Sequence, residues 1–298
     1  MNLSVATPAE WLAGARPRTL PAALAPVLAG TGVAAYVDGA VWGKAALALV
    51  VSLALQVGVN YANDYSDGIR GTDADRVGPL RLVGSGIAAP AAVRTAAFVA
   101  FGIAAVAGLV LAVTTAWWLV AVGLACIVAA WFYTGGSRPY GYAGLGEVMV
   151  FVFFGLVAVV GTTYVQTETL EPASVVAAFG IGALACAILV ANNLRDIPTD
   201  REAGKRTLAV RLGDGTTRQL YAGLVLAVIL AGLIVASLTT WWALLALGYA
   251  GAAAPATRTV LEGASGPALV PVLQQTGTAE LVFGLGLFVG LLLGTLAR

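Results

Sequence analysis

The sequence predicts an all-α, polytopic membrane protein, and three observations support that fold class. The chain has 298 residues, of which 59% are hydrophobic, and its mean hydropathy is +0.90. Only 10% of the residues are charged, whereas a typical soluble domain has about 25%. The charges are also clustered, which leaves long uncharged stretches. A chain this apolar cannot cover a water-exposed surface, so a soluble globular protein is excluded.

The composition also excludes several kinds of chemistry. The chain contains no His, which excludes a Ser-His-Asp triad, a His-ligated metal and a His proton shuttle. Its two cysteines, Cys126 and Cys186, lie in apolar runs and form no CxxC motif, so we interpret them as small core residues. The net charge of +1 gives no indication of a nucleic-acid partner.

Uncharged stretches locate the membrane-spanning helices, because a charge at the centre of a bilayer is costly. A span needs about 20 residues, so the stretches 95–137 and 219–257 each hold two helices joined by a tight turn. Five further stretches hold one helix each: 19–37, 45–63, 148–167, 172–194 and 281–297. The sequence therefore predicts nine transmembrane helices. Segment 263–279, with two prolines and three glycines, is interpreted as a loop, and a tenth span is the alternative.

The N-terminal segment and the basic residues predict the orientation. The start of the chain lacks a basic region followed by a small-residue cleavage site, so a short interfacial helix carrying Trp11 is expected, followed by a first span from Pro21. With the N-terminus in the cytoplasm, only Lys44 and Arg298 of the 16 basic residues fall outside. This predicts a multi-pass protein of the plasma membrane with its charged loops on the cytoplasmic side.

A short internal similarity supports a single domain built from two halves. TTAWWLVAVG at 114–123 is similar to TTWWALLALG at 239–248. We therefore expect one domain over residues 1–298, with pseudo-repeat halves of about 18–145 and 146–278 and a ninth helix over 279–297.

More than half of the charges lie in segments 60–81 and 195–218, each just after a predicted helix. If the helices continue into these segments, the polar side chains of each fall on one helical face. The first face carries Asn60, Asn63, Asp64 and Asp67; the second carries Asn193, Asp196 and Asp200. Pro198 is expected to end or kink the second helix. One such segment alone would be interpreted as a solvated turn, but two at equivalent positions favour a site.

Two facing walls of oxygen ligands predict a magnesium–diphosphate site. Mg²⁺ prefers hard oxygen ligands and usually combines one or two carboxylates with substrate phosphates. Nearby cations, Arg138, Lys205 and Arg206, would neutralise the remaining phosphate charge. An apolar bundle around such a site suits a substrate with an anionic head and a long hydrocarbon tail, such as a polyprenyl diphosphate. Asp73 is a further candidate metal ligand.

Four segments with polar residues carry a further signal: ARPRTLPAALAPVLAGT at 15–31, NDYSDGIRGTDADRVGPLRLVGSG at 63–86, YTGGSRPYGYAGLGEV at 133–148 and NNLRDIPTDREAGKRTLAVRLG at 192–213. Together they resemble the UbiA-type intramembrane prenyltransferases, and in particular the branch that acts on 1,4-dihydroxy-2-naphthoate in menaquinone biosynthesis. The resemblance covers nearly the whole chain. It implies nine helices around a central cavity, with a cap over the cytoplasmic mouth.

The resemblance also implies roles for individual residues. Asn63, Asp64 and Asp67 match the family's first motif, NDxxD, and Asp196 and Asp200 match its second, DxxxD. The broader pattern continues NDxxDxxxD, but the third position here is Gly71 and the next acid is Asp73.

The implied reaction is Mg²⁺-dependent transfer of a polyprenyl group to 1,4-dihydroxy-2-naphthoate, with loss of CO₂ and diphosphate, to give demethylmenaquinol. Arg138 and Lys205 would stabilise the departing diphosphate. The diphosphate is also expected to contact Asn63, Asn193 and Arg206. The acceptor is expected to lie near four residues, of which the two arginines could bind its carboxylate: Arg18, Arg81, Asn60 and Tyr133.

Three other hypotheses stay open at this point. The acceptor could be a different aromatic compound, 4-hydroxybenzoate or homogentisate. A CDP-alcohol phosphotransferase shares the opening Asp64-x2-Asp67-Gly68, but Gly71-Thr72 replaces the Ala-Arg that should follow. A secondary transporter would carry ionisable groups within its spans, whereas the acids here cluster at one interface.

Overall fold

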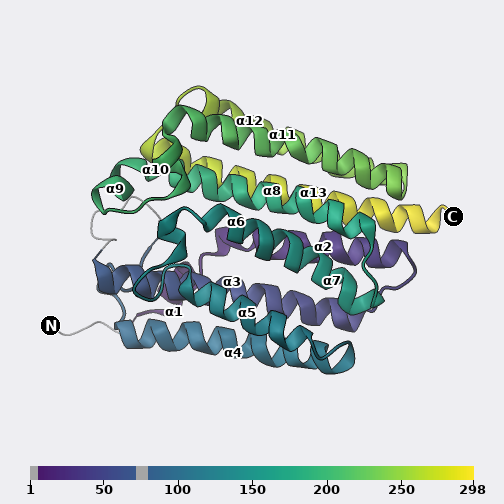
Figure 1. Cartoon of the computed structure of the whole chain (residues 1–298), viewed down its shortest axis with the longest axis horizontal. Helices are drawn as coiled ribbons and strands as arrows, with labels where there is room; N and C mark the ends of the chain where they lie inside the picture. Colours follow the sequence, from purple (N-terminus) through teal and green to yellow (C-terminus); the bar gives the residue numbers. More distant parts are fainter. Residues whose placement is uncertain (1–5, 72–79) are drawn as a thin grey trace.

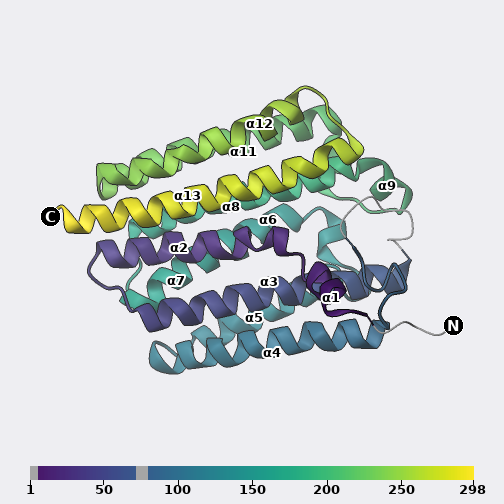
Figure 2. The same cartoon turned by 180° about the vertical axis from the view of Figure 1, so that it is seen from behind.

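The computed structural model describes residues 6–71 and 80–298, and in these residues the chain forms helices and no strand. The helices run side by side in one elongated bundle, with the turns at its two ends (Figures 1 and 2). Three short helices gather at one end, which we call the motif end: α1 (Pro8–Gly14), α9 (Ile197–Glu202) and α10 (Leu208–Leu212). The C-terminus lies at the opposite end.

Nine helical rods make up the bundle in the described part of the chain, which agrees with the predicted all-α fold of nine spans. They are α2 (Pro21–Tyr36), α3 (Trp42–Arg70), α4 (Pro90–Thr114), α5 (Leu119–Phe132), α6 (Gly146–Val150) continued by η3 (Phe151–Val157) and α7 (Ala158–Thr167), α8 (Pro172–Arg195), α11 (Asp214–Leu238), η4 (Trp241–Gly248) continued by α12 (Tyr249–Leu261), and η5 (Gly266–Leu269) continued by α13 (Val270–Leu296). Two short helical turns, η1 (Pro17–Thr19) and η2 (Tyr140–Ala143), complete the described chain.

The rods have the length and surface of membrane-spanning helices. Within the described residues, six are long and apolar enough to cross a membrane, and a seventh forms if Pro8–Thr19 and Pro21–Tyr36, bent by 50°, count as one span. Their outward faces carry large apolar side chains, such as Val106, Leu226 and Leu230, each more than half exposed. Water cannot stabilise such a surface, so the chain is a multi-pass membrane protein.

Both long uncharged stretches divide as predicted. The first breaks between α4 and α5, and the second breaks after Leu238 at the end of α11. The short N-terminal helix α1 carries Trp11 and begins with a capping box, in which Thr7 and Glu10 bond to each other's backbone N–H groups. The first long helix begins at Pro21, as the sequence predicts.

The loop predicted over 263–279 is wrong for most of its length. Helix α13 already begins at Val270, so the ninth helix is longer than the predicted 279–297. Pro271 lies in the first turn of α13 and Pro267 in the first turn of η5. A proline needs no intrahelical donor in a first turn, so these two residues start helices rather than interrupt one.

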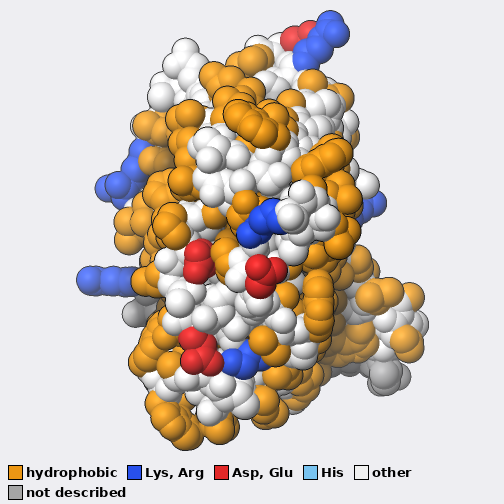
Figure 3. Space-filling model, turned by 90° about the vertical axis from the view of Figure 1, so that its right-hand side faces the viewer, with side chains coloured by type: hydrophobic (Ala, Val, Ile, Leu, Met, Phe, Trp, Pro, Cys, Tyr) orange, Lys and Arg blue, Asp and Glu red, His pale blue; other side chains and the backbone are white. Residues whose placement is uncertain are grey.

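Figure 3 views the end opposite the motifs, where acidic and basic side chains lie among hydrophobic ones. Trp117, Trp118, Trp241 and Trp242 are all exposed in the described structure. Trp is enriched where a membrane meets water, so these side chains fit the rim of a bilayer.

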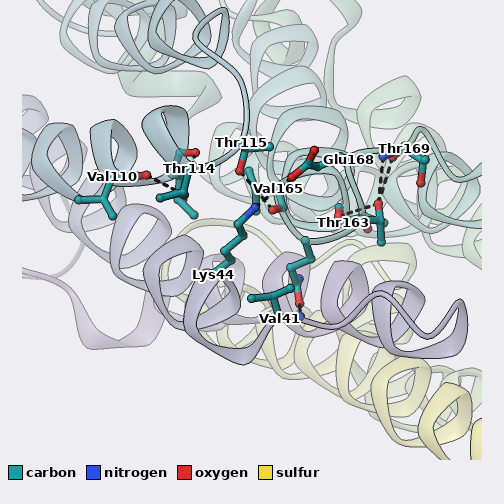
Figure 4. A network of polar contacts seen from close by, with 12 residues as sticks. Val41, Lys44, Val110, Thr114, Thr115, Thr163, Val165, Glu168 and Thr169 are labelled. Carbon is teal, nitrogen blue, oxygen red and sulfur yellow. Dashed lines mark hydrogen bonds and ion pairs between the residues drawn. The ribbon is translucent and has the colours of Figure 1, made fainter.

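Polar contacts hold three helix ends together there (Figure 4). The ammonium Nζ of Lys44 lies 3.4 Å from Oε1 of Glu168, and Thr115 Oγ1 donates to the Val165 carbonyl at 3.3 Å. The Val41 N–H donates to the side chain of Gln166 at 3.3 Å. These contacts join the start of α3 to the ends of α4 and α7.

A close helix–helix approach depends on two glycines. Gly155 in η3, a π-helical stretch, lies against Gly182 of α8. A Cβ on Gly155 would lie 2.8 Å from both the Ala178 carbonyl oxygen and the Gly182 Cα. Small residues of this kind let helix backbones approach in a membrane, where packing is the main source of attraction.

We predict that Gly155→Ala destabilises the protein by about 1–3 kcal/mol, because the new methyl group collides with backbone atoms that cannot move aside independently. The matched control is Gly102→Ala on α4, where a Cβ meets nothing within 4 Å. There the better helix propensity of Ala should be neutral or slightly stabilising. Thermal unfolding in detergent measures both, and equal midpoints for the two variants would contradict the packing argument.

Candidate active site

A cavity of about 1170 Å³ lies inside the bundle. Helices α3, α4 and α5 line one side of it, and α6, η3, α7, α8 and the start of α13 line the other. Its deeper part is apolar, with Phe153, Phe154 and Val157 among the lining residues. Most of its polar lining comes from the motif end and includes Arg16, Arg18, Thr19, Gln56, Asn60, Asn63, Asp67, Arg81, Asn193, Arg195, Asp196, Asp200 and Lys205.

The first wall is the end of α3. The helix continues to Arg70, so the predicted polar face forms, and Asn60, Asn63 and Asp67 line the cavity. Asp67 is 3% exposed, and its Oδ2 lies 3.5 Å from Nη2 of Arg81. The first motif therefore presents a buried carboxylate that is already paired with a cation.

Asp64 lies in a different environment from Asp67. It is fully buried and is not among the residues that line the cavity. Its Oδ2 accepts the Leu82 N–H at 2.7 Å, and its Oδ1 accepts the Val83 N–H at 3.1 Å. In this structure Asp64 anchors the segment that follows the undescribed residues 72–79, and it thereby positions Arg81.

Asn60 anchors a second segment. Its Nδ2 donates to the Ala15 carbonyl at 3.0 Å and to Thr19 Oγ1 at 2.9 Å. The segment between them contains Arg16, whose φ of 55° is left-handed, and Arg18. Asn60 thus holds two arginines at the cavity wall.

The second wall is formed by the junction of α8 and α9. Helix α8 ends at Arg195, and α9 begins at Ile197 with Pro198 in its first turn, as expected of a proline there. Asn193, Asp196 and Asp200 are buried and line the cavity together. The predicted second face therefore forms, although across a break between two helices.

Arg195 binds its own neighbour in the sequence. Its Nε and Nη2 donate to the two carboxylate oxygens of Asp196 at 2.6 and 2.7 Å, and Nη2 also donates to Asn192 Oδ1 at 2.9 Å. Both Arg195 and Asp196 are buried. A bidentate guanidinium–carboxylate pair of this kind is strong and fixes the orientation of the acid.

Tyr142 links the two walls. Its hydroxyl donates a hydrogen bond to Asp67 Oδ1. The Lys205 ammonium lies 4.6 Å from the centroid of the Tyr142 ring and 3.5 Å from Asp200 Oδ1. A continuous set of contacts therefore runs from the first motif to the second across the mouth of the cavity.

The remaining predicted site residues divide between the cavity and the surface of the protein. Arg138 and Arg206 are exposed and do not line the cavity. Tyr133 lines it and packs edge-on against Tyr140, with ring centroids 5.5 Å apart. Asp73 lies outside the described residues.

Tyr140 is unsuited to act as a base at this mouth. Burial raises the pKa of its phenol. The hydroxyl donates to the Ala129 carbonyl at 2.7 Å. Tyr140 therefore stays protonated and ties the loop after α5 to that helix.

No pattern in the sequence selects Arg16, Arg195 or Tyr142 for the site. Adjacent residues on a helix do not face each other, so a pair between Arg195 and Asp196 is not expected from their spacing. It forms because Asp196 leaves the helical conformation, with φ −93° and ψ 4°. Tyr142 could be found only by its position near the other tyrosines in a polar loop.

The residues at the mouth fit a bound Mg²⁺ ion. Among the described residues, no group of three or more acidic or thiol side chains is arranged to hold a metal ion alone. Mg²⁺, however, usually takes one or two carboxylates and completes its shell with water and phosphate oxygens. Asp67, Asp196 and Asp200 line the cavity and supply the carboxylates for such a shell.

Comparison with known proteins places this chain in a family. A model described as the UbiA prenyltransferase family matches residues 23–265. The chain belongs to the UbiA prenyltransferase family.

Curated relatives agree with that assignment. A 1,4-dihydroxy-2-naphthoate octaprenyltransferase of Mycobacterium tuberculosis is 57% identical, over 97% of this chain and 99% of the relative. A protein of the same name from Escherichia coli is 39% identical, over 93% of this chain and 94% of the relative.

Solved UbiA structures share the fold. A UbiA homologue from Archaeoglobus fulgidus bound to GPP and Mg²⁺ superimposes with a TM-score of 0.67 at 15% identity, over 95% of this chain and 99% of that chain. A homologue from Aeropyrum pernix gives 0.69 at 14% identity, over 90% of this chain and 97% of that chain. The family match decides for a prenyltransferase over the phosphotransferase and transporter hypotheses.

We predict that Asp64→Asn destabilises the protein more than Asp67→Asn does. At position 64 an amide N–H₂ would face a backbone donor in a fully buried site, which costs about 1–3 kcal/mol. At position 67 the change removes a charge at the cavity mouth, where the new group can reorient. Thermal unfolding in detergent compares them, and an Asp64→Asn midpoint equal to that of the wild type would refute an anchoring role.

Proposed function

We propose that this UbiA-family protein transfers a polyprenyl group from polyprenyl diphosphate to 1,4-dihydroxy-2-naphthoate, releasing diphosphate and CO₂. The observation that carries the proposal is a cavity whose mouth combines aspartates of both motifs and whose depth is apolar. Such a cavity fits a substrate with a diphosphate head and a hydrocarbon tail. The choice of acceptor rests on the names of the relatives in Mycobacterium tuberculosis and Escherichia coli.

The mouth would bind the diphosphate. Asp67, Asp196 and Asp200 would hold Mg²⁺, which neutralises the diphosphate and makes it a better leaving group. Lys205 lies between Asp200 and Tyr142, so its charge faces the same mouth and stabilises the negative charge that develops as the allylic C–O bond breaks. Arg138 and Arg206 are exposed, so they could reach the diphosphate only by moving inward.

The apolar part of the cavity would hold the prenyl chain. Its lining of aromatic and aliphatic side chains excludes water from the carbon that becomes cationic. The electron-rich naphthoate ring then forms the new C–C bond, and loss of the carboxyl group as CO₂ leaves the prenylated naphthoquinol. This chemistry needs a dry cavity and an oriented ring more than it needs a strong base.

The acceptor carboxylate needs a cationic partner, and two arginines at the cavity mouth could supply it. Arg18 and Arg81 both line the cavity, with Asn60 beside the segment that carries Arg18. The Nη2 of Arg81 also lies 3.5 Å from Oδ2 of Asp67, so Arg81 would lie between a bound acceptor and a bound diphosphate. We assign Arg18 and Arg81 to the acceptor carboxylate, with Tyr133 near the ring.

The basic residues support an orientation with the motif end in the cytoplasm. Both motifs, and the segment that carries Arg16 and Arg18, lie at that end of the bundle. The mouth would then take both substrates at the cytoplasmic face of the plasma membrane and leave the lipid-like product in the bilayer.

Purified protein in detergent with Mg²⁺, a polyprenyl diphosphate and 1,4-dihydroxy-2-naphthoate should form prenylated naphthoquinol and CO₂, both measurable by mass spectrometry. EDTA should abolish turnover. Asp67→Asn and Asp196→Asn should each lower the rate at least about a hundredfold, the scale on which removal of one charge-stabilising group acts.

The acceptor and the reaction class are tested separately. Prenylation of 4-hydroxybenzoate or homogentisate in place of the naphthoate would overturn the acceptor and leave the reaction class intact. No turnover of any aromatic acceptor, by protein with a cooperative unfolding transition, would overturn the reaction itself.

We predict that Tyr142→Phe lowers kcat/KM by about tenfold or more. The change removes only the hydroxyl that bonds to Asp67 and keeps the ring beside Lys205. Hydrogen bonds to charged groups contribute about 1.5–3 kcal/mol. Tyr140→Phe is the matched control, because its hydroxyl bonds to a backbone carbonyl instead. If both variants turn over at the wild-type rate, Tyr142 has no role in joining the walls.

A further inference from the structure

The two motif asparagines have partners of opposite kind. On the first wall, Thr134 Oγ1 donates to the carbonyl oxygen Oδ1 of Asn63 at 2.8 Å. On the second wall, the Asn193 amide nitrogen Nδ2 donates to Oε1 of Glu147 at 2.9 Å. Both asparagines line the cavity and both are nearly buried. One amide is therefore held through its oxygen and the other through its nitrogen.

Glu147 fixes the direction in which the Asn193 amide points. A carboxamide carries its acceptor and its donor on opposite branches, whereas a carboxylate can only accept. The nitrogen of Asn193 must therefore face Glu147, and its oxygen must face away from Glu147. Glu147 does not line the cavity and Asn193 does, so the free branch of the amide is the one directed to the cavity.

The position of Glu147 is fixed by its surroundings, so Glu147 can orient the Asn193 amide. It is 8% exposed on α6, and its backbone carbonyl accepts the Cys186 thiol of α8 at 3.1 Å. Among the described residues, its second carboxylate oxygen, Oε2, has no hydrogen-bond partner. Burying a carboxylate without partners is costly, so Asn193 is the main polar contact that stabilises the Glu147 side chain.

Glu147 has no part in the reaction as described above. It is separated from the cavity by Asn193, which precedes Asp196 by one helical turn on the same wall. An acid behind a ligand typically orients that ligand and strengthens it as an acceptor.

We propose that Glu147 is a positioning residue. It sets the Asn193 amide so that the carbonyl oxygen faces the cavity beside Asp196, which makes Asn193 an oxygen ligand on the cation side of the site. Asn63, held through its oxygen, presents its N–H₂ group and is the amide that donates to the diphosphate. This inference rests on the proposed function, and it reassigns Asn193 from the diphosphate to the cation.

The test exchanges the acid and the amide. In Glu147→Gln, residue 147 can both donate and accept, so it no longer fixes the direction of Asn193. In the double variant Glu147→Gln/Asn193→Asp, the new amide at position 147 donates to a carboxylate at position 193 that always presents an oxygen to the cavity. Cys186→Ala is the matched control, because it removes the other buried hydrogen bond between α6 and α8 and leaves the amide of Asn193 untouched.

The readout is calorimetric titration of Mg²⁺ into protein saturated with geranyl thiolodiphosphate, a donor analogue with a slow leaving group. We expect Glu147→Gln to weaken Mg²⁺ binding about tenfold, as loss of an orienting partner does in metal sites. The double variant should recover the wild-type affinity or exceed it, and Cys186→Ala should bind as the wild type does.

The proposal is overturned by wild-type Mg²⁺ affinity in Glu147→Gln, or by a double variant that binds Mg²⁺ no better than Glu147→Gln. Equal losses in Glu147→Gln and Cys186→Ala would also overturn it, because they would reveal a general packing effect. Product formation by the wild type is scored independently, so failure of this inference is distinguishable from failure of the proposed function.

Discussion

The site depends on one constraint, which is that a charge buried in an apolar bundle is costly unless it is paired. Each of the three carboxylates at the cavity mouth has a cation from another position: Asp67 has Arg81, Asp196 has Arg195 and Asp200 has Lys205. An isolated buried ion would cost several kcal/mol. Without these cations, the three acids could not lie close together in the bundle. The positions of the cations therefore determine where the acids lie, as do the positions of the helices that carry the acids.

The motifs therefore combine residues that face the cavity with residues that hold the structure around it. Asp67 faces the cavity, whereas Asp64, three positions earlier, anchors residues 82 and 83 through two backbone N–H groups. Asn60 lines the cavity and also fastens the segment that carries Arg16. The polar face of α3 does both tasks because its positions spread over an arc wide enough to touch the cavity and the neighbouring segments.

This division explains what could and could not be predicted from the sequence. Helical periodicity and charge-free stretches predict the spans and place both polar faces at one end, because those features depend only on local spacing. Which residue of a polar face reaches the cavity depends on the segments that pack against the helix. The spacing of residues in the sequence does not contain that information. The sequence does not predict the contacts of Arg195 and Tyr142 for the same reason, since these contacts follow from a helix break and from the path of a loop. The start of α13 differs from the prediction because its prolines begin helical turns instead of ending them.

The cavity also separates a well-packed part of the bundle from a more loosely packed part. The largest buried cluster joins α2, α8, α11, α12 and α13, whereas Ala129 is the only buried residue of α5. An empty apolar volume weakens a protein, because the atoms around it lack packing partners. Here the well-packed half supplies stability, and the half around α4 and α5 borders the space that the prenyl chain would fill. Donor binding would then add the packing that the folded chain lacks, and a ligand that binds only the folded state stabilises it in proportion to its affinity and concentration. We therefore expect the folded bundle to be most stable against unfolding when its lipid substrate is bound.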